Sequence, residues 1–272
     1  MNTVFEKYKD LHKGKRVFLI ANGPSLAETN LDLLEEEICI AMNRIPLIYE
    51  KNPKWRPTYY LFSSTNVNNP IWGKPWTESV ISAIKEKQTT PFISSQFKKN
   101  IDPDGKYSNI NWLDCVSETK PDPDGSISKS CFSKDVVERI DKSGTTMNLA
   151  LQLSYHMGFS EIILLGADLG FTKDLGSNLD PNHFDKSYRA SVGNPDKANY
   201  QMRNIHSLAY KNFIKKDKNI KFYNASIKTT LDVYPIIDYE KYILENKVIT
   251  LKQKQKQAES NWNKPHQFFH QL

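Results

Sequence analysis

The turn at residues 22–25 (Asn-Gly-Pro-Ser) has residue types that can bind an anion through the backbone. Asn22 and Gly23 follow an apolar run, and a phosphate can approach the main chain of glycine because no side chain is in the way. Ser25 and Glu28 have the spacing of a capping box, which predicts that a helix begins here. The N–H groups at the start of that helix would favour an anion. Because Ser25 suits the role of helix cap, Asn22 and Gly23 are the better ligand candidates.

Three other apolar runs also end in small or polar residues. Asn43 follows the run 38–42, Ser63 begins a Ser-Ser-Thr segment after the run 59–62, and Asp168 follows the run 161–166. None of these segments forms the dinucleotide fingerprint G-x-G-x-x-G, and the sequence holds no G-x-x-x-x-G-K-[ST] loop. A P-loop kinase or ATPase is therefore disfavoured.

Apolar runs and helical patterns alternate along the chain, and they must position these polar residues. The predicted strands are 16–21, 38–42, 59–62, 90–94, 109–115, 161–166 and 219–223, and the predicted helices are 70–88, 132–140, 146–157 and 197–215. Continuously apolar strands are buried on both faces, and intervening helices imply parallel crossover connections. The sequence therefore predicts an α/β, Rossmann-like three-layer fold with a mainly parallel sheet. Ligands bind outside the carboxyl ends of such strands, where the polar residues lie.

Two segments stand outside this alternation. Residues 170–196 are rich in glycine, asparagine, aspartate and proline, and a loop of this length is typical of a lid. The chain after residue 250 is polar and would suit an appended helix, an oligomer contact or a membrane-surface anchor. We expect one domain over residues 1–250, with a lid at about 170–196 and a polar C-terminal tail at 251–272.

The composition limits the class of protein and its partners. The 272 residues carry a net charge of +6, which suits anionic partners in general, and no nucleic-acid-binding motif accompanies it. No stretch approaches the roughly 20 apolar residues of a membrane helix, and residues 1–15 lack the apolar core of a signal peptide. The three cysteines form no CxxC pair, which favours a reducing compartment. We expect a cytoplasmic location and no nucleic-acid partner, with a basic surface suited to peripheral contact at the inner face of the cell membrane.

Four segments together resemble glycosyltransferase family 42, the bacterial sialyltransferases that use CMP-activated sialic acid. They are 20–26 (IANGPSL), 42–44 (MNR), 144–146 (GTT) and 158–168 (GFSEIILLGAD). Their order and spacing are also similar to the MptE-like family, which includes a pterin pyrophosphokinase and many cell-surface-polysaccharide proteins. The resemblance covers roughly residues 15–227. It implies a variant of the GT-A fold and a transferase that moves a sugar from a nucleotide donor, CMP first of all, to a cell-surface glycan such as lipopolysaccharide. It also implies a homo-oligomer and no cofactor.

The resemblance assigns roles to residues by their position. Asn22 and Gly23 would hold the nucleotide phosphate and ribose, and Asn43 would contact the phosphate or the donor sugar. The remaining implied substrate-binding residues are Ser25, Ser63, Ser64, Thr65, Gly144, Thr145, Thr146, Asp168, Tyr188 and Arg189. Thr145 and Thr146 would serve equally as helix caps, and Asp168 as a cap of the next turn.

His183 is the candidate for the chemical step. Its segment, Asp-Pro-Asn-His-Phe at 180–184, resembles the part of the family that carries the general base. Inverting transfer needs a base within hydrogen-bond reach of the acceptor hydroxyl, and a histidine suits that role near neutral pH. The family's phosphate-binding tyrosines after the Gly-x-Asp segment are missing here. Tyr188, Arg189, Tyr200 or Arg203 could supply the donors instead.

The sequence leaves the question of a metal open between two readings. Asp102-Pro-Asp-Gly and Asp122-Pro-Asp-Gly are similar to D-x-D metal motifs, but ordinary turns have the same sequence and we expect turns. Asp180, His183 and Asp185 could hold Mg²⁺ if the protein is a pyrophosphokinase of the MptE type. The family 42 reading predicts no metal. A third alternative is a non-catalytic module that binds a nucleotide or a glycan.

Overall fold

The computed structural model describes residues 2–118, 132–142, 144–173, 180–190 and 194–262. The chain forms two compact units, Met1–Ile236 and Ile237–Leu272. The second unit contains the helix α5 (Tyr239–Trp262), and the predicted division at residue 250 lies inside this helix. The role of the tail stays a prediction.

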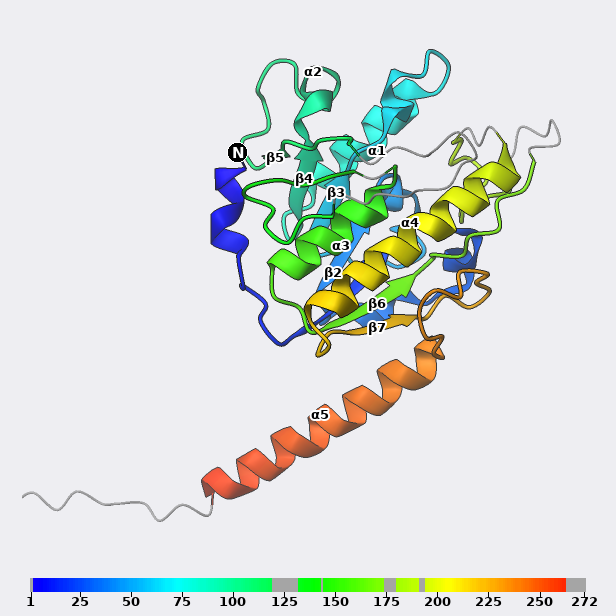
Figure 1. Cartoon of the computed structure of the whole chain (residues 1–272). Coiled ribbons are helices and arrows are strands. Elements are labelled where there is room, and N and C mark those ends of the chain that lie inside the picture. Colours follow the sequence, from blue (N-terminus) through cyan, green and yellow to red (C-terminus); the bar gives the residue numbers. More distant parts are fainter. Residues whose placement is uncertain (1, 119–131, 143, 174–179, 191–193, 263–272) are drawn as a thin grey trace, which may run out of the picture. The chain divides into compact units, whose positions relative to one another are not determined.

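The first unit is built on a parallel sheet (Figure 1). Its seven strands lie in the order β5-β4-β3-β2-β1-β6-β7, and every neighbouring pair is parallel. The strands are β1 (Arg16–Ile20), β2 (Cys39–Met42), β3 (Tyr59–Phe62), β4 (Thr90–Ser94), β5 (Asn111–Leu113), β6 (Glu161–Leu165) and β7 (Lys221–Asn224). The predicted strands are confirmed, with ends that differ by no more than two residues.

Helices cover both faces of the sheet, so the predicted three-layer α/β, Rossmann-like fold is confirmed. The helices α3 (Thr146–His156) and α4 (Pro195–Lys216) lie on one face, and α1 (Gly73–Lys85) lies on the other (Figure 1). The remaining helices of this unit are short: η1 (Thr3–Tyr8), η2 (Pro24–Glu28), η3 (Leu31–Leu34), η4 (Ile45–Ile48), η5 (Thr65–Asn68), η6 (Ser95–Phe97) and α2 (Lys98–Ile101). Within the described residues, no helix combines the length and the apolar character needed to cross a membrane.

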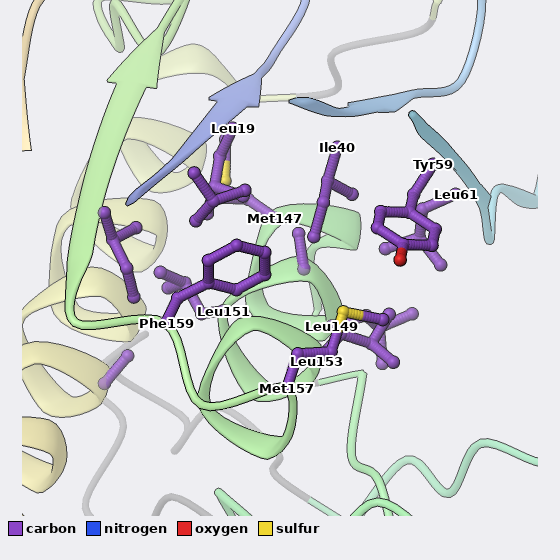
Figure 2. Packing of buried hydrophobic residues seen from close by; sticks show 14 of the residues in the cluster. Leu19, Ile40, Tyr59, Leu61, Met147, Leu149, Leu151, Leu153, Met157 and Phe159 are labelled. Carbon is purple, nitrogen blue, oxygen red and sulfur yellow. The ribbon is translucent and has the colours of Figure 1, made fainter. Parts of the chain in front are cut away.

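The core between the sheet and α3 fixes where this helix begins. Leu149 and Leu153 of α3 are fully buried and belong to one cluster with Leu19, Ile40 and Leu61 of the strands (Figure 2). Each buried leucine contributes about 1.5–3 kcal/mol to folding. This packing holds α3 in register with the central strands, and its N-terminus therefore stays near their carboxyl ends.

The helix predicted over residues 132–140 is absent, and that prediction was wrong. Side chains of this segment satisfy backbone groups that a helix would use. Ser133 Oγ accepts from the N–H of Asp135 at 3.2 Å, and Asp135 Oδ1 accepts from the N–H of Val137 at 2.9 Å. Such local hydrogen bonds favour turns over a helix. Val136 and Ile140 are still buried in the core, which explains the helix-like apolar pattern.

The strand order reverses between β1 and β6. From β1 the chain builds outward through β2 to β5, and it then returns to place β6 on the other side of β1. Ligands of open α/β sheets bind at such a reversal, outside the carboxyl ends of the strands. The turn after β1 and the segment 166–168 after β6 therefore lie side by side at the expected position.

Candidate functional site

A cleft opens at the carboxyl ends of β1, β2 and β6, with about 710 Å³ of space when its open mouth is included. Its lining comes from the strand ends, the start of α3, the segment 180–190 and α4. The lining residues are 21–24, 42–43, 145–147, 166–169, 171, 182–183, 188, 202, 206 and 231. The structure thus brings the β1 turn and His183 to one cavity.

The turn after β1 is locked to the segment after β6 by Asp168. Its carboxylate accepts the Ser25 N–H at 2.6 Å and also accepts the Ser25 hydroxyl. Gly23 allows this approach, since a Cβ there would lie 2.5 Å from Asp168 Oδ2 and 2.6 Å from the carbonyl oxygen of Gly166. The predicted capping box does not form. Ser25 lies inside the 3-10 helix η2, and its hydroxyl binds Asp168 instead of capping the helix.

The backbone of this turn has no amide to offer an anion between residues 23 and 26. The Gly23 N–H donates to the carbonyl of Gly166 at 2.8 Å, and the Leu26 N–H donates to the carbonyl of Gly23 at 3.1 Å. Pro24 has no N–H, and Ser25 is bound by Asp168. The expectation that a helix start at this turn presents amides to an anion was therefore wrong, because a buried carboxylate of the protein occupies that place.

The buried carboxylate is itself perturbed. Burial raises the pKa of Asp168, and the negative charge of Glu28 adds to this, whereas the two hydrogen bonds from Ser25 oppose it. Asp168 lines the cleft and is 5% exposed. Its contacts with Ser25 support the loop after β1, and a direct role in substrate binding stays a prediction.

Asn22 is the member of the turn that has hydrogen-bonding capacity to spare. Its backbone carbonyl accepts the N–H of Phe184 at 3.1 Å, which ties the β1 turn to the segment that carries His183. Its side-chain Oδ1 is buried and has no partner among the described residues. An unpaired buried acceptor is costly, so a ligand hydroxyl or amino group that reached it would gain affinity.

At the start of α3, Thr145 donates its N–H to the carbonyl of Lys142 at 3.1 Å and Asn148 donates its N–H to the carbonyl of Thr145 at 3.1 Å, which leaves the N–H of Thr146 as the candidate backbone donor to a ligand. Thr145 is the N-cap, and its hydroxyl accepts the N–H of Met147 at 3.3 Å. Thr146 is the first residue of this 11-residue helix, whose first turn holds no acidic residue. The Thr146 hydroxyl lies 3.3 Å from the carbonyl of Ser63 and 3.4 Å from Asn43 Oδ1. Since all three residues 145–147 line the cleft, the positive end of α3 faces it.

His183 presents an imidazole that a carboxylate holds in place. Its Nδ1 lies 3.0 Å from both Oδ1 and Oδ2 of Asp180. Burial alone would raise the pKa of Asp180, but the hydrogen bond and charge of His183 and the N–H groups of Ala190 and Asn182 outweigh it and lower the pKa. The ionised carboxylate accepts the Nδ1–H and leaves the Nε2 lone pair as the basic site. No described residue hydrogen-bonds Nε2.

Tyr188 stacks on this imidazole, and Arg44 anchors the backbone of the same segment. The ring of Tyr188 is stacked on that of His183, with centroids 3.9 Å apart and planes 5° from parallel. The buried guanidinium of Arg44 donates to the carbonyls of Ser187 at 2.7 Å and Tyr188 at 2.6 Å. Trp76 of α1 donates its indole N–H to the carbonyl of Arg189 at 3.0 Å. Segment 180–190 is therefore fixed to the sheet on the β2 and β3 side. That it acts as a lid stays a prediction, and residues 174–179 and 191–193 lie outside the described residues.

Several predicted site residues do not line the cleft. Ser25 is buried behind Asp168, and Ser64 caps η5 through the N–H of Asn66 at 3.4 Å. Arg189 contributes its carbonyl to the Trp76 bond. The other three are Ser63, Thr65 and Gly144, which lie outside the cleft lining; Ser63 accepts from the Thr146 hydroxyl, and Gly144 precedes Thr145. Tyr200 and Arg203 line a separate hollow with residues 169–170, 199 and 230, where Arg203 pairs with Asp232 at 2.6 Å.

The described residues provide no ready metal site. Among them, no group of three histidine, cysteine, aspartate or glutamate side chains is placed to hold an ion. Asp180 is committed to His183, and Asp185 accepts from the backbone and hydroxyl of Ser187 at 2.7 and 2.6 Å. Asp102 caps its own turn through the N–H of Lys106 at 2.6 Å. The second Asp-Pro-Asp-Gly segment, at residue 122, lies outside the described residues.

Two residues of the site had no functional role in the sequence analysis. Arg44 was part of the Met-Asn-Arg segment, but its anchoring bonds depend on a contact 143 residues away in sequence. His206 lies in α4 and lines the cleft. Its i, i+4 spacing to Met202, which also lines the cleft, was the available signal, because residues at that spacing share a helix face.

Comparison with known proteins places the fold. No protein-family model and no curated protein sequence matches this chain. Among solved structures, the chain is similar to a MAf glycosyltransferase from Magnetospirillum magneticum AMB-1, with a TM-score of 0.51 and 13% sequence identity. The match covers 85% of this chain and 35% of that one, so this chain spans about a third of its neighbour's length. The chain therefore shares the Rossmann-like fold of part of a glycosyltransferase.

Proposed function

We propose that this protein is a glycosyltransferase that moves a sugar from a nucleotide donor, with CMP the first candidate, onto a cell-surface glycan. The observation that carries the proposal is the Asp180–His183 pair at the cleft, with Nδ1 held at 3.0 Å by the carboxylate and Nε2 unbonded among the described residues. A base of this kind suits the removal of a proton from an acceptor hydroxyl.

The proposed reaction is a single displacement with inversion. His183 Nε2 accepts the proton of the acceptor hydroxyl as that oxygen forms a bond to the anomeric carbon. The bond between the anomeric carbon and the phosphate oxygen breaks, and the nucleotide phosphate leaves with the electron pair. Asp180 stabilises the imidazolium that forms, because the carboxylate stays ionised next to it.

The departing phosphate would lie at the N-terminus of α3. Thr145, Thr146 and Met147 line the cleft there, and no acidic side chain in the first turn opposes an anion. This differs from the expectation that the Gly23 turn holds the phosphate, since the amides of that turn are already bonded within the protein. Asn22 and Asn43 would then contact the ribose or the donor sugar.

The fold comparison supports a transferase in general terms. A glycosyltransferase shares this arrangement of strands and helices, although only over about a third of its length. The sugar, the acceptor and the choice of CMP rest on the resemblance to family 42. A cytoplasmic location, a peripheral membrane contact and a homo-oligomer are proposals on the same basis.

A thermal-shift panel tests this proposal. The protein would be heated with CMP, UDP, GDP or ATP, each with and without Mg²⁺, because a ligand that binds the native state raises its apparent stability. At 100 times its Kd a ligand adds about 2.7 kcal/mol, which corresponds to a rise in Tm of about 5–10 °C for a chain of this size. We expect this rise with CMP and without Mg²⁺. A rise only with ATP and Mg²⁺ would favour a pyrophosphokinase, and no rise with any nucleotide would contradict the proposal.

A further inference from the structure

His206 provides a second imidazole that lines the same cleft. His206 and Met202 come from α4, and Leu231 follows β7, so this end of the cleft lies over β6 and β7. His183 belongs to the end over β2, where Arg44 anchors its segment. The two histidines therefore meet different parts of any ligand that spans the cleft.

Tyr234 determines which nitrogen of His206 carries the proton. The Tyr234 hydroxyl lies 2.9 Å from His206 Nδ1, and the two rings meet edge to face with centroids 5.7 Å apart. Tyr234 is 2% exposed and is packed between Phe222 and Tyr210. Nδ1 is the one hydrogen-bond partner of the Tyr234 hydroxyl among the described residues. The buried hydroxyl group therefore donates its hydrogen bond to Nδ1. The ring proton then resides on Nε2.

The imidazole stays neutral and keeps one donor to spare. Burial lowers the pKa of His206 to about 4, so the ring is uncharged near neutral pH. The side chain is 6% exposed, it lines the cleft, and no described residue hydrogen-bonds its Nε2. An N–H that lines the cleft and has no partner among the described residues gains from a ligand acceptor that reaches it.

Part of the cleft lining is apolar. Met202 shares a face of α4 with His206, and Leu231 and Met147 also line the cleft. Apolar walls with one polar group suit a flat heterocycle that needs its faces covered and one edge atom paired. A neutral N–H pairs with an acceptor on the edge of such a ring, either a carbonyl oxygen or an unprotonated ring nitrogen.

We propose that His206 is a nucleobase-binding residue that donates its Nε2–H to an acceptor atom on the edge of the base, with Tyr234 as the positioning residue that fixes the tautomer. This inference rests on the proposed function, and it places the nucleobase of the donor at the β7 end of the cleft.

Calorimetric titration of the full chain with CMP, AMP and ribose 5-phosphate tests the inference. We expect the wild type to bind CMP at least tenfold more tightly than ribose 5-phosphate, and AMP serves as a second nucleotide whose ring nitrogens can accept the same N–H. His206→Phe keeps the ring volume without the donor and should weaken CMP about tenfold, with ribose 5-phosphate unchanged. His206→Gln keeps an amide N–H and should retain most of the affinity for CMP. Tyr234→Phe should weaken CMP by a smaller factor and also leave ribose 5-phosphate unchanged.

The outcomes separate this inference from the proposed function. If the wild type binds none of the nucleotides, the proposed function fails. If it binds CMP and His206→Phe binds CMP equally well, only the role of His206 fails. A loss in His206→Phe that is equal for CMP and ribose 5-phosphate would also overturn it, because such a loss reflects damage to the cleft and not recognition of the base. A Tm within a few degrees of the wild type shows that each variant is folded.

Discussion

Asp180 places both of its carboxylate oxygens 3.0 Å from Nδ1 of His183, three residues along the chain. The same carboxylate accepts the N–H groups of Asn182 at 2.9 Å and Ala190 at 3.0 Å. The Asp180 carboxylate thus orients the imidazole and also holds the loop 180–190 together through these backbone hydrogen bonds. The geometry is that of a base with its orienting group, in which the carboxylate fixes the tautomer and stabilises the protonated ring.

Replacing Asp180 with asparagine should slow transfer by roughly 10²- to 10⁴-fold, because an amide neither fixes the Nδ1–H tautomer nor stabilises the imidazolium. The nucleotide Kd should change little, since the cleft keeps its shape. Single-turnover transfer and nucleotide titration measure the two effects separately. Asp185→Asn is the matched control, because among the described residues the Asp185 side chain hydrogen-bonds only with Ser187, and it should keep the wild-type rate.

Arg44→Lys should lower kcat by roughly 10- to 100-fold while leaving the nucleotide Kd within about twofold, because a small misplacement of a catalytic group costs rate more than binding. A lysine cannot reproduce the planar guanidinium, which donates to two carbonyls beside the rings of Trp76 and Tyr188. The control is Arg56→Lys, at a guanidinium that donates to the carbonyls of Asn52 and Trp55 outside the cleft lining. Equal loss in both variants would refute a positioning role for Arg44.

Gly23→Ala should destabilise the fold by about 3 kcal/mol or more, since a methyl group would overlap Asp168 and the carbonyl of Gly166. Gly23 has a φ of −68°, so the cost arises from space and not from backbone conformation. Gly105→Ala supplies the contrast, because Gly105 has open space but a φ of +66° and should lose only about 1–2 kcal/mol. Urea unfolding of both variants measures the difference, and a smaller loss in Gly23→Ala than in Gly105→Ala would contradict the close approach.

Ser25→Ala should destabilise the protein by about 1–3 kcal/mol at pH 8, and by less at pH 4. A raised pKa means that the folded state holds the Asp168 proton more tightly than the unfolded state, so stability falls as the pH rises through the folded pKa. Without the Ser25 hydroxyl, the folded-state pKa of Asp168 rises further. The free energy of unfolding therefore falls more at pH values above 3.8, the ordinary pKa of an aspartate. Urea unfolding at the two pH values checks this. Ser160→Ala, at an exposed serine, should show no such dependence, and a loss in Ser25→Ala that is equal at both pH values would rule out the linkage.

Much of the fold could be predicted because the strands are buried on both faces. Runs such as 162–165 are apolar and buried at every position, and such runs with helices between them indicate a parallel sheet. The segment 132–140 could not be predicted in the same way. Its apolar residues have helical spacing and are buried, but the turns made by Ser133 and Asp135 replace the helix.

The site could be predicted only where it follows a strand. Asn22, Asn43 and Asp168 come directly after strands whose carboxyl ends meet, so topology alone brings them together. What each group bonds to depends on contacts that sequence spacing does not reveal. The Ser25 amide is bound by a carboxylate 143 residues away, and His206 reaches the cleft through the placement of α4.

The rate of sugar transfer by His183→Ala, measured in a single turnover with a nucleotide-sugar donor and an acceptor glycan, tests the central claim most directly. We expect the rate to fall by roughly 10²- to 10⁴-fold, as is usual when a general base is removed, while CMP binds with an unchanged Kd. His156→Ala serves as a control for the loss of a buried histidine outside the cleft and should keep the rate. Transfer by His183→Ala at the wild-type rate would contradict the assignment of His183 as the base and, with it, the proposed mechanism.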